Sequence, residues 1–222
     1  MVDYAQKILA LPDAPQQVEI LMQAINDEKR RRRDFREWVK PDVKAEFING
    51  EVIVHSPVKR RHWKITDLLS SVLSVYTRFR RLGSVGTEKV MISLTRNDYE
   101  PDLVFFSKEK TAAFHDEQVL FPAPDFVVEI LSKGTAAKDK GIKKKDYAAH
   151  GIQEYWIIDP IKQQIQQYIL FLPTDKNYSP AKIFTIDDDI ESRVIEGFTI
   201  PVRAIFEEET NLITLQKIMQ SL

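Results

Sequence analysis

Residues 124–160 read PDFVVEILSKGTAAKDKGIKKKDYAAHGIQEYWIIDP, and this stretch decides the fold class. Its run FVVEIL (126–131) is apolar on both faces, which is typical of a central strand covered on both sides. A basic segment at 136–150 predicts a helix, and EYWIID (154–159) predicts a second buried strand, which Pro160 ends. Strand, helix and strand in this order predict a right-handed, parallel βαβ unit and therefore an α/β protein.

The segments on either side extend this unit into a mixed sheet with flanking helices. The sequence AEFINGEVIVHSP predicts a hairpin, because Asn49-Gly50 between two β-rich runs is the strongest short turn signal. Apolar residues at helical spacing predict an amphipathic helix over 60–82. The remaining patterns predict a strand region at 84–95, a polar turn at 96–101, a strand at 102–106, antiparallel strands at 163–171, 181–186 and 192–200, and a closing helix at 211–221.

A further helix is predicted near the start of the chain, over residues 15–38. Its first half carries apolar residues at helical spacing and its second half is almost wholly charged. We therefore expect it to pack by its first half only. The sequence thus predicts an N-terminal helical arm over 1–42 and an α/β domain over 43–222.

Length and composition limit the classes of protein. At 222 residues the chain buries roughly 70% of its unfolded surface, so it needs no disulfide or metal to fold. It has no cysteine, which excludes a zinc–thiolate site and a cysteine nucleophile. We expect a soluble cytoplasmic protein, because it shows neither a secretory signal nor an apolar run near the ~20 residues that span a bilayer.

The charges are balanced in number but clustered in place. Lys and Arg number 32 against 33 Asp and Glu, for a net charge of -1. The basic residues gather in KRRRR (29–33), KRRHWK (59–64) and KDKGIKKK (138–145). Such clusters can attract a polyanion even when the total charge is neutral, although each one can equally be an ordinary solvated helix face.

Two carboxylates carry the clearest chemical signal. Glu129 lies inside FVVEIL, where burying a charge costs several kcal/mol unless it is paired or bound to a cation. Asp102 follows Pro101 and begins the apolar strand LVFF. If the two strands are neighbours, both carboxylates can converge on one divalent cation such as Mg²⁺ or Mn²⁺. The alternative is that Glu129 forms a structural salt bridge.

A lysine on the following helix completes the candidate site. Asp139, Lys143 and Tyr147 are four residues apart and would share one helix face. An ammonium there could orient an attacking water or stabilise charge in the transition state of phosphoryl transfer. The pattern alone does not separate Lys143 from Lys140 or Lys145.

These motifs together resemble the Uma2-type endonucleases of the PD-(D/E)XK restriction-endonuclease-like superfamily. The resemblance covers roughly 43–206 and rests on Pro101-Asp102, PDFVVEILS, the Asp139, Lys143 and Tyr147 set, GIQEYWIIDP, and AEFINGEVIVHSP with His62 shortly after it. It implies a restriction-endonuclease-like mixed sheet with a central βαβ unit and flanking helices, to which the sequence pattern adds the N-terminal helical arm and a C-terminal antiparallel extension.

The resemblance also implies roles for individual residues. In the superfamily's usual motif the lysine lies two residues after the acid, but Leu131 occupies that position here, and Lys143 takes the matching place on the helix. Glu46 is implied as an accessory carboxylate near the metal, and the Ile130 carbonyl as a further ligand beside Asp102 and Glu129. His62, Ser132, Asp139 and Tyr147 are implied to support the metal ligands or to contact a phosphate.

The predicted function is a Mg²⁺-dependent endonuclease that hydrolyses DNA, with Mn²⁺ as a possible substitute. Binding to the DNA backbone is assigned to Lys59, Arg60, Arg61, Lys138, Lys140, Lys144 and Lys145. A homodimer is expected, because cutting both strands requires two sites. Two alternatives stay open: a non-catalytic nucleic-acid- or protein-binding module of the same fold, and an interaction protein in which Glu129 merely pairs with Lys143.

Overall fold

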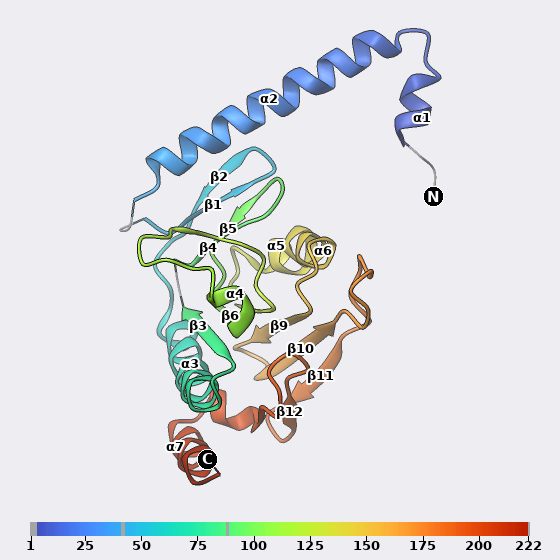
Figure 1. Ribbon diagram of the computed structural model, residues 1–222. Coiled ribbons are helices and arrows are strands. Elements are labelled where there is room, and N and C mark those ends of the chain that lie inside the picture. Colours follow the sequence, from blue (N-terminus) through green and yellow to red (C-terminus); the bar gives the residue numbers. More distant parts are fainter. Residues whose placement is uncertain (1–3, 41–42, 88, 222) are drawn as a thin grey trace. The chain divides into compact units, whose positions relative to one another are not determined.

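The computed structural model describes residues 4–40, 43–87 and 89–221, and it divides into two compact units (Figure 1). The first unit is Met1–His55 and the second is Ser56–Leu222. No helix among the described residues is both long enough and apolar enough to cross a membrane.

The first unit contains two helices and a hairpin. Helix α1 (Tyr4–Leu9) precedes the long helix α2 (Ala14–Trp38), and β1 (Ala45–Ile48) pairs antiparallel with β2 (Glu51–Val54). Asn49 and Gly50 join the strands with φ values of 50° and 85°. Both residues are in the left-handed region that this tight turn requires, which confirms the predicted hairpin.

Helix α2 packs differently from the prediction. Its buried residues are Ala14 and Phe35, and the Phe35 ring lies 5.8 Å from the ring of Phe47 in β1. The expectation that α2 packs by its first half is therefore wrong. An aromatic ring in the charged half provides the contact with the hairpin, whereas the apolar residues of the first half are exposed, namely Val18, Leu21, Met22 and Ile25.

The second unit is built on a six-stranded sheet in the order β11-β10-β9-β8-β6-β3. Strands β8 and β9 are parallel, and every other pair in this sheet is antiparallel. The bounds are β3 (Gly83–Thr87), β6 (Leu103–Ser107), β8 (Phe126–Ile130), β9 (Glu154–Asp159), β10 (Gln164–Ile169) and β11 (Lys182–Thr185).

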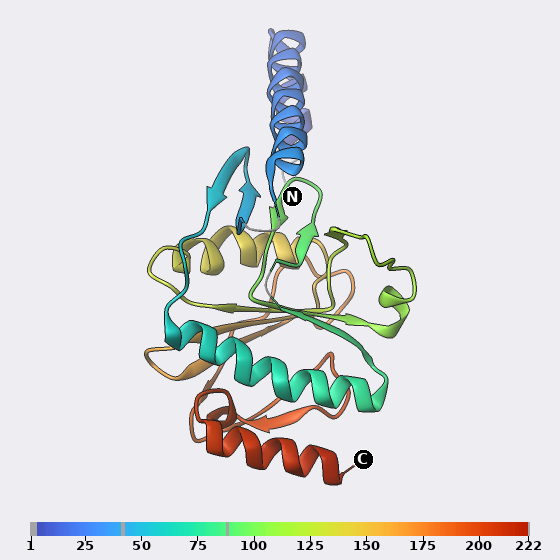
Figure 2. The same ribbon diagram turned by 90° about the vertical axis from the view of Figure 1, so that its left-hand side faces the viewer.

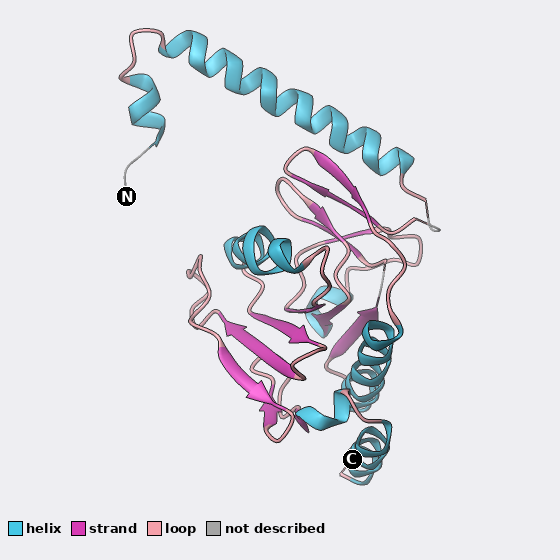
Figure 3. Ribbon diagram, turned by 180° about the vertical axis from the view of Figure 1, so that it is seen from behind, coloured by secondary structure: helices cyan, strands magenta, loops and turns pink. Residues whose placement is uncertain are grey.

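The predicted βαβ unit is confirmed. Between β8 and β9 the chain forms α5 (Ala136–Lys138), one turn of π-helix η1 (Asp139–Lys143) and α6 (Lys144–Ala149). These helices cover one face of the sheet, and α3 (Arg60–Arg80) covers the other (Figures 2 and 3). The mixed α/β fold of the sequence prediction is thus present.

The main hydrophobic core lies between the sheet and α3. Every second residue of β8 points into it, from Phe126 through Val128 to Ile130, and meets the apolar face of α3. Side chains alternate along a strand, so Val127 and Glu129 lie on the face covered by η1 and α6. The strand register therefore decides which helix meets the carboxylate.

Helix α7 (Glu208–Gln220) packs beside α3 and closes this layer. It follows a short antiparallel pair, β12 (Asp189–Glu191) and β13 (Thr199–Pro201), and the 3-10 helix η2 (Val202–Ile205). The single strand predicted over 192–200 is wrong, because most of that segment is a turn between these two strands.

The strand region predicted at 84–95 contains two strands, β3 and then β4 (Met91–Ser93), which belongs to a different sheet. A second prediction near the site is corrected. The predicted polar turn contains strand β5 (Asp98–Tyr99), which pairs antiparallel with β4. Strand β4 also pairs in parallel with β7 (Leu120–Phe121), and the short helix α4 (Lys108–Thr111) follows β6. The polar residues of this segment favoured the prediction of an exposed turn, but Asn97, Asp98 and Glu100 are all buried.

Candidate active site

The two predicted carboxylates meet across neighbouring strands. Asp102 directly precedes β6, and the antiparallel register that pairs Leu103 with Val128 brings Asp102 opposite Glu129. Both residues are 4% exposed. The sequence placed each on a strand, and the pairing of β6 with β8 is what makes them neighbours.

The Asp102 carboxylate is fixed from two sides. Its Oδ2 accepts a hydrogen bond of 2.8 Å from the backbone N–H of Ile130 and lies 3.1 Å from Nε2 of His62. His62 is buried in the first turn of α3, and its Nδ1 has no hydrogen-bond partner among the described residues. The structure therefore places His62 against Asp102, not on the free surface of the helix.

The Glu129 carboxylate is held by groups from the helical connection. Oε1 of Glu129 lies 3.0 Å from Nζ of Lys143 and accepts a hydrogen bond of 2.8 Å from the hydroxyl of Tyr147. Lys143 Nζ also lies 3.4 Å from Oδ1 of Asp139. Lys143 is only 2% exposed, which is unusual for a lysine and requires such partners. Lys143 and Tyr147 of the predicted set therefore contact Glu129, and Asp139 contacts Lys143.

The electrostatic effect of these acids reaches the neighbouring strand. Burial raises the pKa of Tyr155 well above its ordinary value, and the charges of Glu129 and Asp139 raise it further. Its hydroxyl donates a 3.1 Å hydrogen bond to the backbone oxygen of Asp139. Tyr155 is therefore a neutral, buried structural residue beside the site.

The sequence did not predict a cluster of polar side chains that lies near Lys143. The ammonium of Lys143 lies 5.8 Å from the centre of the Tyr99 ring, and the Tyr99 hydroxyl donates a 2.8 Å hydrogen bond to Asp146. Asn97 and His150 also bind this carboxylate, at 2.7 Å and 3.0 Å. Asn97 and Tyr99 lie in a segment predicted as a turn, so nothing in the local pattern placed them beside the lysine.

Other predicted residues lie outside this group of contacts. Ser132 is exposed, and its Oγ accepts a 3.2 Å hydrogen bond from Thr135 N, so it shapes the loop before α5. Glu46 belongs to the first unit, where it is buried and lies 3.1 Å from Nε2 of His55. Its role at the metal stays a prediction.

The predicted DNA-binding side chains differ in how far they are available to solvent. Lys140 and Lys145 are exposed on the helical connection, whereas Lys138 is half-buried. Lys144 is also half-buried, with its ammonium 4.9 Å from the centre of the Tyr168 ring. Lys59, Arg60 and Arg61 at the start of α3 are exposed.

The donor set determines which metal would fit. Within the described part of the chain, no group of three or more His, Cys, Asp or Glu side chains is arranged to hold a metal ion. Asp102 and Glu129 supply two carboxylates, and a hard ion such as Mg²⁺ commonly binds through one or two carboxylates and completes its shell with water and substrate. The two buried acids therefore fit such an ion in their chemistry.

A mixed sheet with a central βαβ unit, and two acids opposed across its inner strands, define a restriction-endonuclease-like α/β protein. Residues 32–203 match the model of the Uma2 family, described as "Putative restriction endonuclease", and the chain belongs to this family. This membership confirms the resemblance seen in the sequence and indicates a nuclease-like function.

Two relatives support the assignment at different levels. A solved structure described as a "putative nuclease belonging to DUF820", from Anabaena variabilis, superposes with a TM-score of 0.66 at 19% identity. It covers 78% of this chain and 94% of its own, and it establishes the shared fold. An uncharacterized protein of Synechocystis sp. is 27% identical over 127 residues, which are 56% of this chain and 71% of that protein.

Proposed function

We propose that the protein is a divalent-metal-dependent endonuclease that hydrolyses phosphodiester bonds in DNA. One observation carries the proposal: Asp102, directly before β6, lies opposite Glu129 on β8, with the buried ammonium of Lys143 3.0 Å from Glu129. Two acids and a lysine are the components that metal-assisted phosphodiester hydrolysis needs. Family membership supports the same reaction class.

Asp102 and Glu129 are the residues that would hold the ion, which we propose to be Mg²⁺ or Mn²⁺, with the Ile130 carbonyl as a further ligand. Such an ion supplies Lewis-acid chemistry and lowers the pKa of a bound water. The Ile130 N–H and His62 fix the orientation of Asp102, while Tyr147 fixes that of Glu129.

Lys143 has a separate role in the proposal. Its ammonium is held between Glu129 and Asp139 in a buried site, where a positive charge acts on a developing negative charge more strongly than it would in water. We assign it to orienting the attacking water and stabilising the charge on the phosphoryl oxygens. Tyr99 and Tyr147 restrict the movement of its side chain.

A second candidate is a binding module with an idle site. The observation in its favour is that Lys143 already forms close ion pairs with Glu129 and Asp139, which is how a purely structural salt bridge would look. In that case the buried pair serves the fold, and the exposed lysines of the helical connection serve binding alone.

A cleavage assay separates the two candidates. The wild-type protein is incubated with plasmid and with single-stranded DNA in Mg²⁺, Mn²⁺ or EDTA, beside Asp102→Asn and Lys143→Ala. We expect metal-dependent cutting by the wild type and at least a ~100-fold loss in each variant. The matched control is Asp125→Asn, because Asp125 is also buried beside β8 but pairs with Lys110 at 2.8 Å.

The control variant Asp125→Asn should lose stability but keep the wild-type rate of DNA cleavage per folded molecule. Cutting that survives Asp102→Asn would refute the proposed site. A wild type that binds DNA but never cuts it with either metal would establish the binding module.

A further inference from the structure

The first turn of α3 has an unusual composition for a helix start. Acidic or small polar residues are normally favoured there, because the first N–H groups lack acceptors and the helix dipole is positive. Here the N-cap residue is Lys59, which forms no side-chain cap, and Arg60 and Arg61 follow it. Glu208 pairs with Lys64 at 2.8 Å and also interacts with Arg60. The positive charges of Lys59 and Arg61, in contrast, lie where the helix itself is already positive, which favours the binding of an anion.

A second observation concerns His62, which comes next in the chain. His62 is 8% exposed, and its buried Nδ1 has no hydrogen-bond partner in the described segments 4–40, 43–87 and 89–221. Its other ring nitrogen contacts Asp102. The basic turn thus contacts Asp102 of the proposed active site directly, and Nδ1 of His62 lacks a partner among the described residues.

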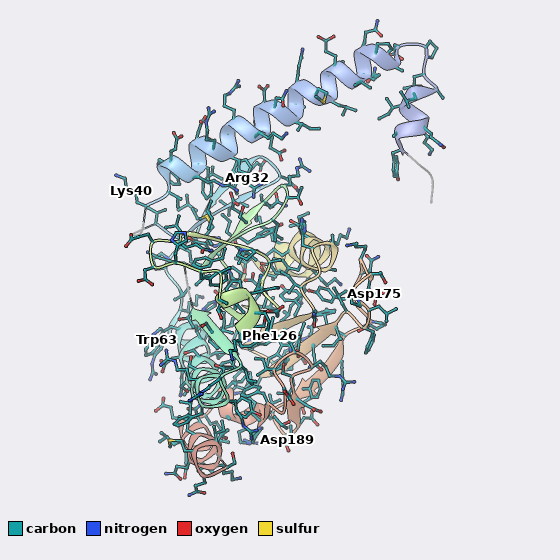
Figure 4. The ribbon with its side chains drawn as sticks, viewed as in Figure 1. Arg32, Lys40, Trp63, Phe126, Asp175 and Asp189 are labelled. Atoms are coloured by element: carbon teal, nitrogen blue, oxygen red, sulfur yellow. The ribbon has the colours of Figure 1, made fainter. Side chains whose placement is uncertain are left out.

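The third observation is Trp63, which is 53% exposed and lies at the N-terminal end of α3 (Figure 4). A large indole is usually well buried, yet Trp63 has no ring contact or cation–π contact with any described residue. Successive helix residues differ by about 100°, so Arg61 and Trp63 project on either side of His62. Neither Lys59 nor Arg61 forms an ion pair with a described residue.

We propose that the α3 N-terminal turn (Lys59–Trp63) binds an unpaired nucleotide of the substrate. Its phosphate lies at the start of the helix, beside the side chains of Lys59 and Arg61. Its base stacks on the Trp63 indole. This inference rests on the proposed function, and it names the substrate class: DNA with at least one unpaired base next to the cut phosphate.

The choice of an unpaired nucleotide follows from the geometry of stacking. A base inside a duplex stacks on its neighbours and offers no free face to a protein ring, whereas single strands are bound by aromatic side chains in basic surroundings. Basic residues alone would bind duplex and single strand alike through phosphates. The exposed ring is therefore the feature that discriminates between them.

The test is a binding measurement in EDTA, so that no strand is cut. Fluorescence anisotropy compares a labelled single-stranded oligonucleotide with the blunt duplex of the same sequence, for the wild type, Trp63→Ala and Trp63→Phe. We expect the wild type to favour the single strand. Trp63→Ala should weaken that binding about 5- to 100-fold and leave duplex binding unchanged, while Trp63→Phe keeps most of it.

Phe79→Ala is the matched control, because Phe79 is a 60% exposed aromatic residue near the other end of α3. Its affinity should equal that of the wild type. Equal single-strand affinity of Trp63→Ala and wild type would overturn the inference, and so would an equal loss on single strand and duplex.

This outcome is independent of the proposed nuclease activity. A protein that cuts DNA but shows no Trp63-dependent preference refutes the inference alone. A protein that shows the preference in EDTA but never cuts refutes the enzyme alone.

Discussion

Glu129 shows how one buried charge constrains its surroundings. It lies on an apolar strand, and its ionised form is tolerated because Lys143 and Tyr147 bind the same oxygen. Removing one partner of a buried ion pair costs far more than replacing both by neutral groups, since the remaining charge is left without compensation. Stability and catalysis can therefore be separated at this pair.

Lys143→Met should destabilise the fold by about 3–5 kcal/mol, because it removes the ammonium from Glu129 and Asp139. The double variant Lys143→Met/Glu129→Gln should recover part of that loss, since it neutralises the strand carboxylate but leaves the buried Asp139 without the ammonium. Urea unfolding measures both, and the cleavage assay on the same samples should show no activity in either.

The double variant provides the decisive comparison. If it is as stable as the wild type and also cuts DNA as fast, the pair is only a structural salt bridge. If it is stable but inactive, the two side chains act in the reaction.

At the scale of elements, the π-helical turn η1 explains how Lys143 reaches the sheet. The sequence predicted an ordinary helix with Asp139, Lys143 and Tyr147 on one face. The structure has a π turn over Asp139–Lys143, and such turns often mark functional sites. Both Asp139 and Lys143 belong to this wider turn, and both are buried beside the sheet.

A second buried carboxylate, Glu154, joins β9 to the C-terminal extension. One oxygen accepts hydrogen bonds from Trp156 Nε1 at 2.6 Å and Gln167 Nε2 at 2.7 Å. The other accepts from the Ser192 hydroxyl at 2.7 Å and from the next two backbone N–H groups at 2.8 Å and 3.1 Å. The carboxylate therefore holds the turn that follows β12 against the sheet.

Glu154→Gln should destabilise the protein, because its amide group would face hydrogen-bond donors, and each donor left unsatisfied costs about 1–3 kcal/mol. The pH dependence has a definite sign. Burial raises the pKa of Glu154 above its ordinary value of 4.5, so the folded state binds the proton more tightly than the unfolded state. The stability contributed by Glu154 is then fully present below that ordinary value and is lost as the pH rises through the raised one.

The measurement is urea unfolding of wild type and Glu154→Gln over a pH series. The difference in unfolding free energy should grow as the pH falls from neutral toward 4.5. If the difference shrinks over that interval, the five hydrogen bonds that Glu154 accepts lower its pKa by more than burial raises it.

At the scale of the whole molecule, the distribution of charge matters more than the total. The net charge is -1, which gives no overall attraction to DNA. The exposed basic residues at the start of α3 and on the helical connection can still bind phosphates locally, because charge interactions fall off over about 10 Å at ordinary ionic strength. We expect binding that depends strongly on salt.

Log–log plots of DNA affinity against salt concentration should be linear, with a slope of about 0.7 to 0.9 per phosphate contacted. Lys145→Glu should reduce the size of this slope by about the amount expected for one phosphate contact, since Lys145 is exposed on the helical connection. Lys217→Glu is the control, because Lys217 is also exposed but lies on α7, outside the predicted clusters. An unchanged slope for Lys145→Glu would remove it from the DNA-binding set.

The sequence by itself determined the parts of the fold that rest on local patterns. The apolar strands on either side of a basic helix gave the βαβ unit, and Asn49-Gly50 gave the hairpin, since backbone preferences act over a few residues. The acids and Lys143 were also identifiable, because a charge inside an apolar strand needs a partner and the family motif names it.

Only the tertiary structure decided which distant residues meet. The β6–β8 register put Asp102 opposite Glu129, and the packing of α3 brought His62 to Asp102. The sequence also did not predict the contact of Tyr99 with Lys143 or the packing of α2 through Phe35. Such contacts depend on how distant segments of the chain pair and pack, and patterns over a few residues do not predict this.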